Sequence, residues 1–361
     1  MRNFLPLLAL PVLATALTAC GDLSQEDLLF RAAVPQKQQV ELRTAGAGSQ
    51  ASTSSSTAST VSQGLAASCA DGDLRCNAEK TAHDFNALTF GLLDVIDTIL
   101  KQEPTTRSHG RRVWGPFFIA GNGDKPDGTA RFEMFREDDG VTFGFCLHAA
   151  EGRIENRQAA DVNCDVDVDA DTHLAVILSG TFTPGEIGAR ARTGSGDLHL
   201  RTDRIRDFHN IARTMNITFD NTHDETDIEL SLDGVVFNGN ELIDPLSFHF
   251  VRKADASGSL HFDVLGDIFN PNAVVPPATS PTPSLLEKLN LDAEWDAAQA
   301  GRAHATIDGG DLPVGGGFVE TQCWDAAGST VFVTATPPNG HPHHGSEGLC
   351  VFRSDPPPPS P

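Results

Sequence analysis

Tyrosine is absent from this sequence of 361 residues, and tryptophan occurs only three times, although there are 21 phenylalanines. Porin-type proteins carry girdles of tyrosine and tryptophan where their strands meet the two membrane interfaces. The near-absence of both residues argues against that architecture. After residue 17 the chain also lacks an apolar run long enough to cross a bilayer as a helix.

Basic residues are few for the length of the chain. There are 26 lysines and arginines against 49 aspartates and glutamates, which gives a net charge of −23. A surface of this sign repels phosphate backbones, so nucleic acid is not an expected partner. The acidity is interpreted as a device for solubility.

Recognisable catalytic motifs are missing as well. The sequence contains no H-E-x-x-H pair, no P-loop and no dinucleotide fingerprint. Ser195 lies between two glycines but not in the G-x-S-x-G pattern of a nucleophile elbow. No C-x-x-C spacing indicates a zinc site. We therefore predict no catalytic residue, no metal ligand and no cofactor, with a secreted or periplasmic hydrolase that lacks a recognisable motif as the alternative.

The N-terminus carries the most informative motif. Arg2 precedes an apolar run over residues 4–17, and the last residue of the run begins the letters LTAC at positions 17–20. This pattern resembles the lipobox of bacterial lipoprotein signal peptides. The resemblance implies that residues 1–19 are removed and that Cys20 is acylated with palmitate-type chains, which anchor a protein without spanning the membrane. Because Gly21 rather than aspartate follows the cysteine, the resemblance implies the outer membrane, with the protein in the periplasm or exposed at the surface.

The next segment predicts a lipidated, disordered tether over residues 20–64. Residues 44–63 are nearly all Ala, Gly, Ser, Thr and Gln, which cannot bury enough apolar surface to become ordered. A short amphipathic piece around Leu28-Leu29-Phe30 is the exception. The other predicted boundaries are a single β-rich domain at 65–353, a Pro-rich loop inside it at 271–285 and a disordered Pro-rich tail at 354–361.

Six cysteines remain besides Cys20. An even number in an exported protein indicates disulfides, here three, although six cysteines allow about fifteen connectivities. Sequential pairing is favoured because each pair then closes a short segment. The predicted pairs are Cys69–Cys76, Cys146–Cys164 and Cys323–Cys350.

One helix and many strands are predicted. Apolar residues recur at helical spacing over 78–101, with Asn77 as a cap and Pro104 beyond the end. From residue 113 onward, short alternating runs and Gly/Asp turns indicate antiparallel hairpins, for example around the turn at 137–140. The predicted fold is mainly β: an antiparallel, curled or half-closed, barrel-like sheet with one N-terminal helix packed on it. Strands are expected near 131–135, 141–145, 173–178, 197–201, 215–219, 227–232, 248–251, 260–265, 289–295, 303–307, 318–324, 330–335 and 349–352.

Three scattered stretches resemble a group of uncharacterised lipoproteins of myxobacterial type. They are Val113-Trp114-Gly115-Pro116-Phe117, the segment 179–185, and the C-terminal motifs at 301–303, 309–312, 322–325 and 350–352. The resemblance implies a β-rich architecture and a Cys323–Cys350 bridge. It implies no activity and no site residue.

The acidic run at 161–171 is the strongest candidate for a cation site. An EF-hand loop would need glycine at its sixth position and glutamate at its twelfth. Counting from Asp165, those positions hold Ala170 and Val176. The run is therefore interpreted as a strand or loop with one solvated acidic face, and a calcium-binding envelope protein is kept as an alternative. Two further candidates, the acidic turn at 220–225 and the histidine cluster at 341–344, are interpreted as loops.

The predicted function is that of a non-catalytic binding or structural module of the cell envelope. A sheet with a helix across it can enclose an apolar pocket, and strand phenylalanines would line it. The alternative for these residues is that they form the core. The expected partners are the membrane, through the lipid anchor, and either an apolar ligand or another envelope protein. The phenylalanines considered are Phe143, Phe145, Phe248 and Phe250.

Overall fold

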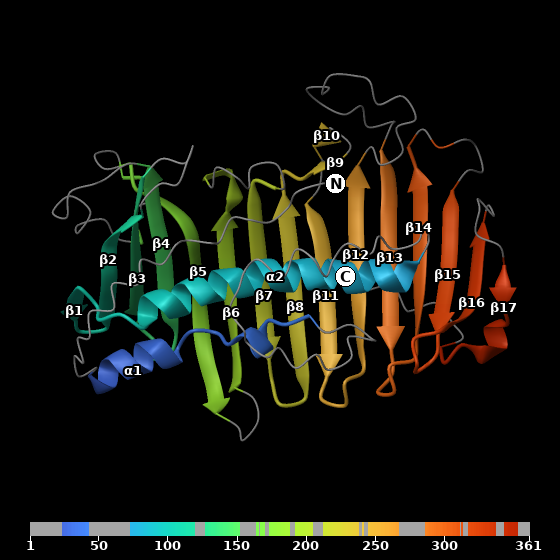
Figure 1. Cartoon of the computed structure of the whole chain (residues 1–361), viewed down its shortest axis with the longest axis horizontal. Helices are drawn as coiled ribbons and strands as arrows, with labels where there is room; N and C mark the ends of the chain where they lie inside the picture. Colours follow the sequence, from blue (N-terminus) through green and yellow to red (C-terminus); the bar gives the residue numbers. More distant parts are fainter. Residues whose placement is uncertain are drawn as a thin grey trace.

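The computed structural model shows a wide antiparallel sheet with helices on one face (Figure 1). It describes residues 24–42, 73–119, 127–151, 164–165, 167–169, 173–187, 192–204, 212–237, 240–241, 245–266, 286–310, 312, 317–336 and 343–352. Several predictions fall outside these residues: the signal peptide at 1–19, acylation of Cys20, the Pro-rich loop at 271–285 and the tail at 354–361.

Fifteen strands form one unclosed sheet in the described part of the chain, and they follow one another almost in sequence order. Each strand pairs antiparallel with its neighbours, and only the short ribbon of β9 and β10 stands apart. The prediction of a mainly β, antiparallel sheet with an N-terminal helix packed on it is confirmed, and the sheet, expected to be curled or half-closed, is unclosed. The C-terminal strands complete the same sheet. The bounds are β1 Thr106–Ser108, β2 Arg111–Ile119, β3 Gly128–Arg136, β4 Phe143–Glu151, β5 Ala175–Ile187, β6 Arg192–Arg201, β7 Thr214–Asn221, β8 Glu225–Asp233, β9 Val236–Phe237, β10 Asn240–Glu241, β11 Leu246–Lys253, β12 Gly258–Gly266, β13 Glu287–Trp295, β14 Gly301–Gly309, β15 Phe318–Trp324, β16 Thr330–Thr336 and β17 His344–Gly345.

The prediction of a strand near 349–352 is wrong. A short 3₁₀ helix, Glu347–Leu349, occupies the start of this segment and is followed by irregular chain. The backbone N–H of Cys350 donates a hydrogen bond to the carbonyl of Glu347 (3.0 Å), so this N–H is not available to a neighbouring strand. The disulfide to Cys323 then holds the segment against β15.

A long helix, α2 (Leu74–Leu100), crosses the strands at a steep angle and covers much of one face of the sheet (Figure 1). Its 27 residues span about 40 Å at 1.5 Å per residue, which matches roughly eight spacings of about 4.8 Å between strands. The helix begins earlier than predicted because Asp73, not Asn77, caps it by accepting a hydrogen bond from the N–H of Cys76 (3.0 Å).

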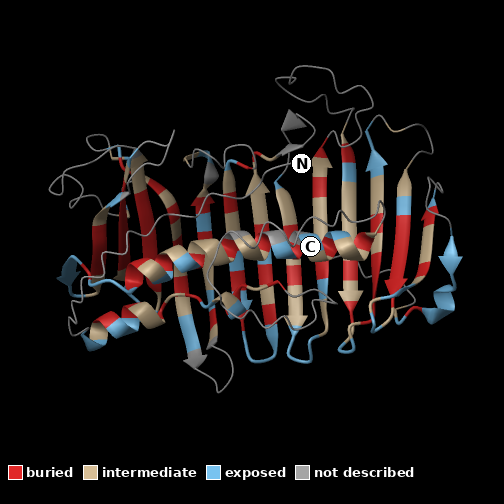
Figure 2. Ribbon diagram, viewed as in Figure 1, coloured by how far each residue is buried: buried red, intermediate tan, exposed pale blue. Residues whose placement is uncertain are grey.

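Buried residues recur along α2 (Figure 2), and their size changes along the helix. Small residues, Ala78 and Ala82, face the sheet near the N-terminus of the helix, whereas Phe85, Leu93 and Ile96 do so further on. The bulky half packs into the main core with the strand phenylalanines. Beside Ala78 and Ala82 the helix therefore leaves more space above the sheet than it does further on.

A short helix, α1 (Gln25–Ala32), and a 3₁₀ turn, η1 (Lys37–Gln39), precede α2. Phe30 and Val40 are completely buried in the core. The expected disordered tether over 20–64 is therefore wrong for residues 24–42. The amphipathic piece around Phe30 is the reason, because its apolar face finds a partner in Phe143 at a ring-centroid distance of 5.3 Å. Residues 43–64 lie outside the described residues.

The two faces of the sheet differ in chemistry. Alternate residues of β7 and β8, such as Ile217 and Leu230, point into the core, while their neighbours Asn216 and Glu229 point to the other face. This period of two is what an antiparallel sheet with one buried face requires. The second face is polar. On this face, disulfides attach the segments that contain Cys164 and Cys350 to strands β4 and β15.

The disulfides Cys146–Cys164 and Cys323–Cys350 are present as predicted, with Cα–Cα distances of 5.7 and 5.5 Å. The third predicted pair includes Cys69, which lies outside the described residues. Among the described residues, no helix is long and apolar enough to span a membrane.

Candidate functional site

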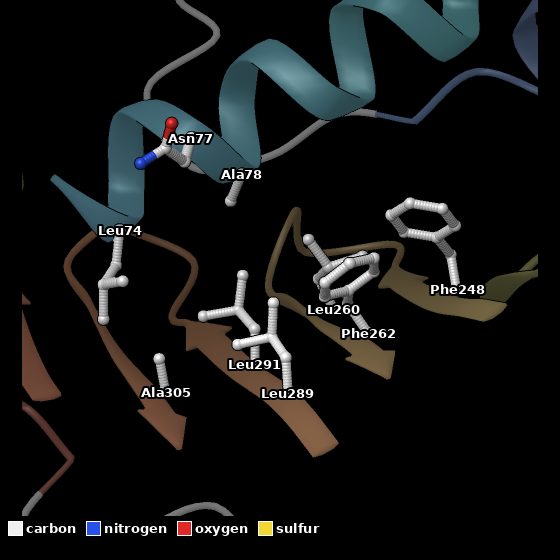
Figure 3. Close-up of a pocket in the computed structure, with 9 residues that line it drawn as sticks. All are labelled: Leu74, Asn77, Ala78, Phe248, Leu260, Phe262, Leu289, Leu291 and Ala305. Carbon is white, nitrogen blue, oxygen red and sulfur yellow. The ribbon is translucent and has the colours of Figure 1, made fainter. Parts of the chain in front are cut away.

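An apolar cavity of about 230 Å³ lies between the first turns of α2 and the sheet (Figure 3). Side chains from α2 form its roof, and residues of β11, β12, β13 and β14 form its floor and walls. The lining consists of Leu74, Asn77, Ala78, Phe248, Leu260, Phe262, Leu289, Leu291 and Ala305. Asn77 is the single polar member of this set.

Small residues create the cavity. Ala78 on the helix and Ala305 on β14 both carry only a methyl group where the two layers face each other. Phe248 and Phe262 stand beside one another on neighbouring strands, with ring centroids 4.8 Å apart, and bound the cavity on one side. A leucine at either alanine would occupy much of this volume.

Polar contacts hold the N-terminus of α2 in place above the cavity. The side chain of Gln322 on β15 accepts a hydrogen bond from the N–H of Arg75 (3.0 Å) and donates one to Asp73 (3.2 Å). Arg75 also donates to the carbonyl of Gly328 and pairs with Glu79 (2.8 Å). Burial is the main reason why the pKa of Glu79 is raised, in spite of this pairing. The roof is thus fixed to the β15–β16 hairpin rather than resting on apolar contacts alone.

The chemistry of the lining suits binding rather than catalysis. None of the nine lining residues is an acid, a base or a nucleophile. A dry apolar cavity of about 150 Å³ is known to bind benzene, so a cavity of about 230 Å³ has room for a somewhat larger apolar group. An aliphatic chain segment or a small fused ring fits that description.

The four phenylalanines singled out from the sequence all belong to the core, and one of them also lines the cavity. Phe143, Phe145 and Phe250 are buried in the main core, where Phe250 packs against Trp295 at 5.9 Å. Phe248 alone of the four lines the cavity. Ala78 of α2, whose small side chain leaves the space open, is not marked by any pattern in the sequence.

Among the described residues, one group of side chains has ligand atoms close enough together to hold a metal ion: Glu133, Cys146 and Cys164. The two sulfurs are joined in a disulfide, so neither is a thiolate. The carboxylate of Glu133 pairs with Arg111 (2.6 Å) and Arg131 (2.9 Å). The group is therefore a structural ion-pair cluster beneath a disulfide.

The acidic run at 161–171 is described only in part. Within it, Asp167 receives two hydrogen bonds of 2.7 Å from the guanidinium of Arg204, which lowers the pKa of Asp167. Arg204 also donates to the carbonyl of Val176 (2.8 Å) and so ties the run to β5. This carboxylate is engaged by an arginine. The turn at 220–225 joins β7 to β8 as predicted. Of the histidine cluster, residues 341 and 342 lie outside the described residues, and His344 starts β17.

Sequence reasoning missed a row of polar residues on the open face of the sheet. Register places Glu229, His249, His261, Asp292 and His304 side by side on five neighbouring strands. Within this row His261 contacts Asp292 at 2.7 Å. The period-two pattern of each strand shows which residues share a face, but the register that aligns them is visible only in the structure.

Comparisons of the chain with protein-family models, curated proteins and solved structures found no match.

Proposed function

We propose that this chain is a non-catalytic lipoprotein of the cell envelope, anchored through acylated Cys20, that binds a small apolar ligand beneath α2. The cavity is the observation that carries the proposal. It combines an apolar lining with a helix whose position is set by its own polar contacts.

The chemistry of the lining defines the ligand class. Branched aliphatic side chains and two phenylalanine rings recognise an alkyl or aromatic group and offer nothing to a charged one. The two disulfides of the described residues suit an oxidising, extracytoplasmic compartment, where lipids and their acyl chains are available. An acyl chain segment or a naphthalene-sized ring is the expected occupant.

A fluorescent probe of matching size tests the proposal. The full chain is titrated with 2-aminonaphthalene, whose emission shifts to the blue in apolar surroundings, and the bound probe is then displaced with the uncharged 1-octanol. Ala78→Leu fills the cavity from the helix side. Ala87→Leu makes the same change on the same helix at a position that does not line the cavity.

Binding in the wild type and in Ala87→Leu, with loss in Ala78→Leu, is the expected result. Near-ultraviolet circular dichroism checks that the two variants keep the native packing. Probe binding that is equally strong in Ala78→Leu would place the ligand elsewhere and overturn the proposal.

A further inference from the structure

Helix α1 presents two large apolar side chains to solvent. Leu28 is 51% exposed and Leu29 is 48% exposed, whereas Asp27 and Phe30 on the opposite side are buried. Leucines next to each other on one exposed face form a patch rather than a scattered surface residue. The helix therefore has one apolar contact with the core and a second apolar face that the described part of the chain leaves exposed.

The helix is held firmly at one end of the sheet. Arg112 of β2, which is 3% exposed, pairs with Glu26 (2.5 Å) and Asp27 (2.6 Å). At the other end of α1, Arg31 donates to the carbonyl of Leu100 (2.5 Å). These contacts fix the direction in which Leu28 and Leu29 point relative to the sheet.

The lipid anchor lies close to this patch along the chain. Ser24 caps α1, and only four peptide units separate it from Cys20. At 3.8 Å between successive Cα atoms, the two residues are at most about 15 Å apart. Acyl chains on Cys20 would thus enter a bilayer within about 15 Å of the start of α1.

We infer that the Leu28–Leu29 face of α1, at the β1 end of the sheet, docks on the membrane that carries the anchor (Figure 1). This inference rests on the acylation of Cys20 in the proposed function. An interfacial helix buries its apolar face at the boundary between headgroups and acyl chains. Because the chain carries a net charge of −23, the favoured surface is zwitterionic, such as phosphatidylcholine.

Tryptophan quenching tests the orientation in the acylated, full-length protein. The three native tryptophans, Trp114, Trp295 and Trp324, are at most 3% exposed and supply a constant background. Leu28→Trp places a reporter in the patch. Leu349→Trp is the matched control, because Leu349 is 64% exposed and lies at the β17 end of the sheet. Leu29→Trp is a second reporter in the patch, should the first substitution disturb folding.

Each protein is bound to phosphatidylcholine vesicles with normal or brominated acyl chains, and flotation with the vesicles is measured in parallel. The expected result is that all variants float and that the extra emission of Leu28→Trp, but not of Leu349→Trp, is quenched by the brominated lipid. Equal quenching of the two reporters in floating protein would overturn the docking while leaving the anchor intact. Failure of the wild type to float would overturn the anchor itself, and with it the docking, but would leave the cavity untouched.

Discussion

Replacing Asp27 with asparagine should loosen α1 from the sheet. Burial alone would raise the pKa of Asp27, but hydrogen bonds from Arg112, Ser24 and Arg107 outweigh it and hold the pKa at about 2 instead of the ordinary 3.8. A difference of nearly two pKa units corresponds to about 2.5 kcal/mol in favour of the folded helix at neutral pH. Removing the charge also leaves the buried Arg112 with Glu26 as its single carboxylate partner among the described residues.

The effect is local, so hydrogen exchange in the segment 24–36 is the appropriate measurement. A loss of about 2.5 kcal/mol makes the opening of α1 roughly 60-fold more favourable, and amide exchange there should accelerate by a similar factor. Asp94→Asn is the matched control, because it breaks an ion pair with Lys37 in which both side chains are largely exposed. Exposed pairs of this kind contribute at most about 1 kcal/mol.

Acid should reproduce the effect in the wild type. The pKa of Asp27 is lowered on folding, so its contribution is fully present above pH 3.8 and is lost as the pH falls towards 2. After correction for intrinsic exchange rates, protection of α1 should therefore hold at pH 5 and fall between pH 3.8 and pH 2. Unchanged protection in Asp27→Asn at pH 7, or the same small change as in Asp94→Asn, would show that this charge does not secure the helix.

Three further substitutions have defined outcomes. Cys20→Ala should shift the protein from the membrane fraction to the soluble fraction and remove the acyl mass from the intact protein, and an unchanged mass would refute acylation. Cys350→Ala opens a disulfide with a sequence separation of 27 residues and should cost about 3 kcal/mol in urea unfolding, with no loss expected when reductant is already present. Arg204→Met removes both hydrogen bonds to Asp167 and should raise the pKa of that aspartate towards its ordinary value, as measured by NMR titration.

Much of the fold follows from local patterns in the sequence. Alternation along β3 and β4, with a turn rich in Asp and Gly between them, predicts the hairpin that the structure contains. The apolar period of α2 predicts a helix packed on the sheet, and the spacing of the cysteines predicts two of the observed disulfides. Each of these signals lies within some thirty residues and depends on elementary geometry.

The remainder depends on contacts between residues that are distant in the chain. The order of α1 depends on Arg112, which lies more than 80 residues away, and no pattern in the sequence near α1 indicates that contact. The cavity arises because Ala78 of the helix meets strands that begin at residue 246. No periodicity in the sequence marks a place where two small residues will face each other.

The nearly sequential order of the strands also bears on how the chain folds. Each hairpin can pair with the one before it as soon as it is made, so the sheet requires few contacts between distant residues and can grow one hairpin at a time. The clamp between Arg75 and Gln322 is different, because it joins residues 247 positions apart. We therefore expect the amides of the early hairpins to become protected from hydrogen exchange first during folding. The amides at the N-terminus of α2 should follow, because this end of the helix can bind the sheet only after β15 has formed.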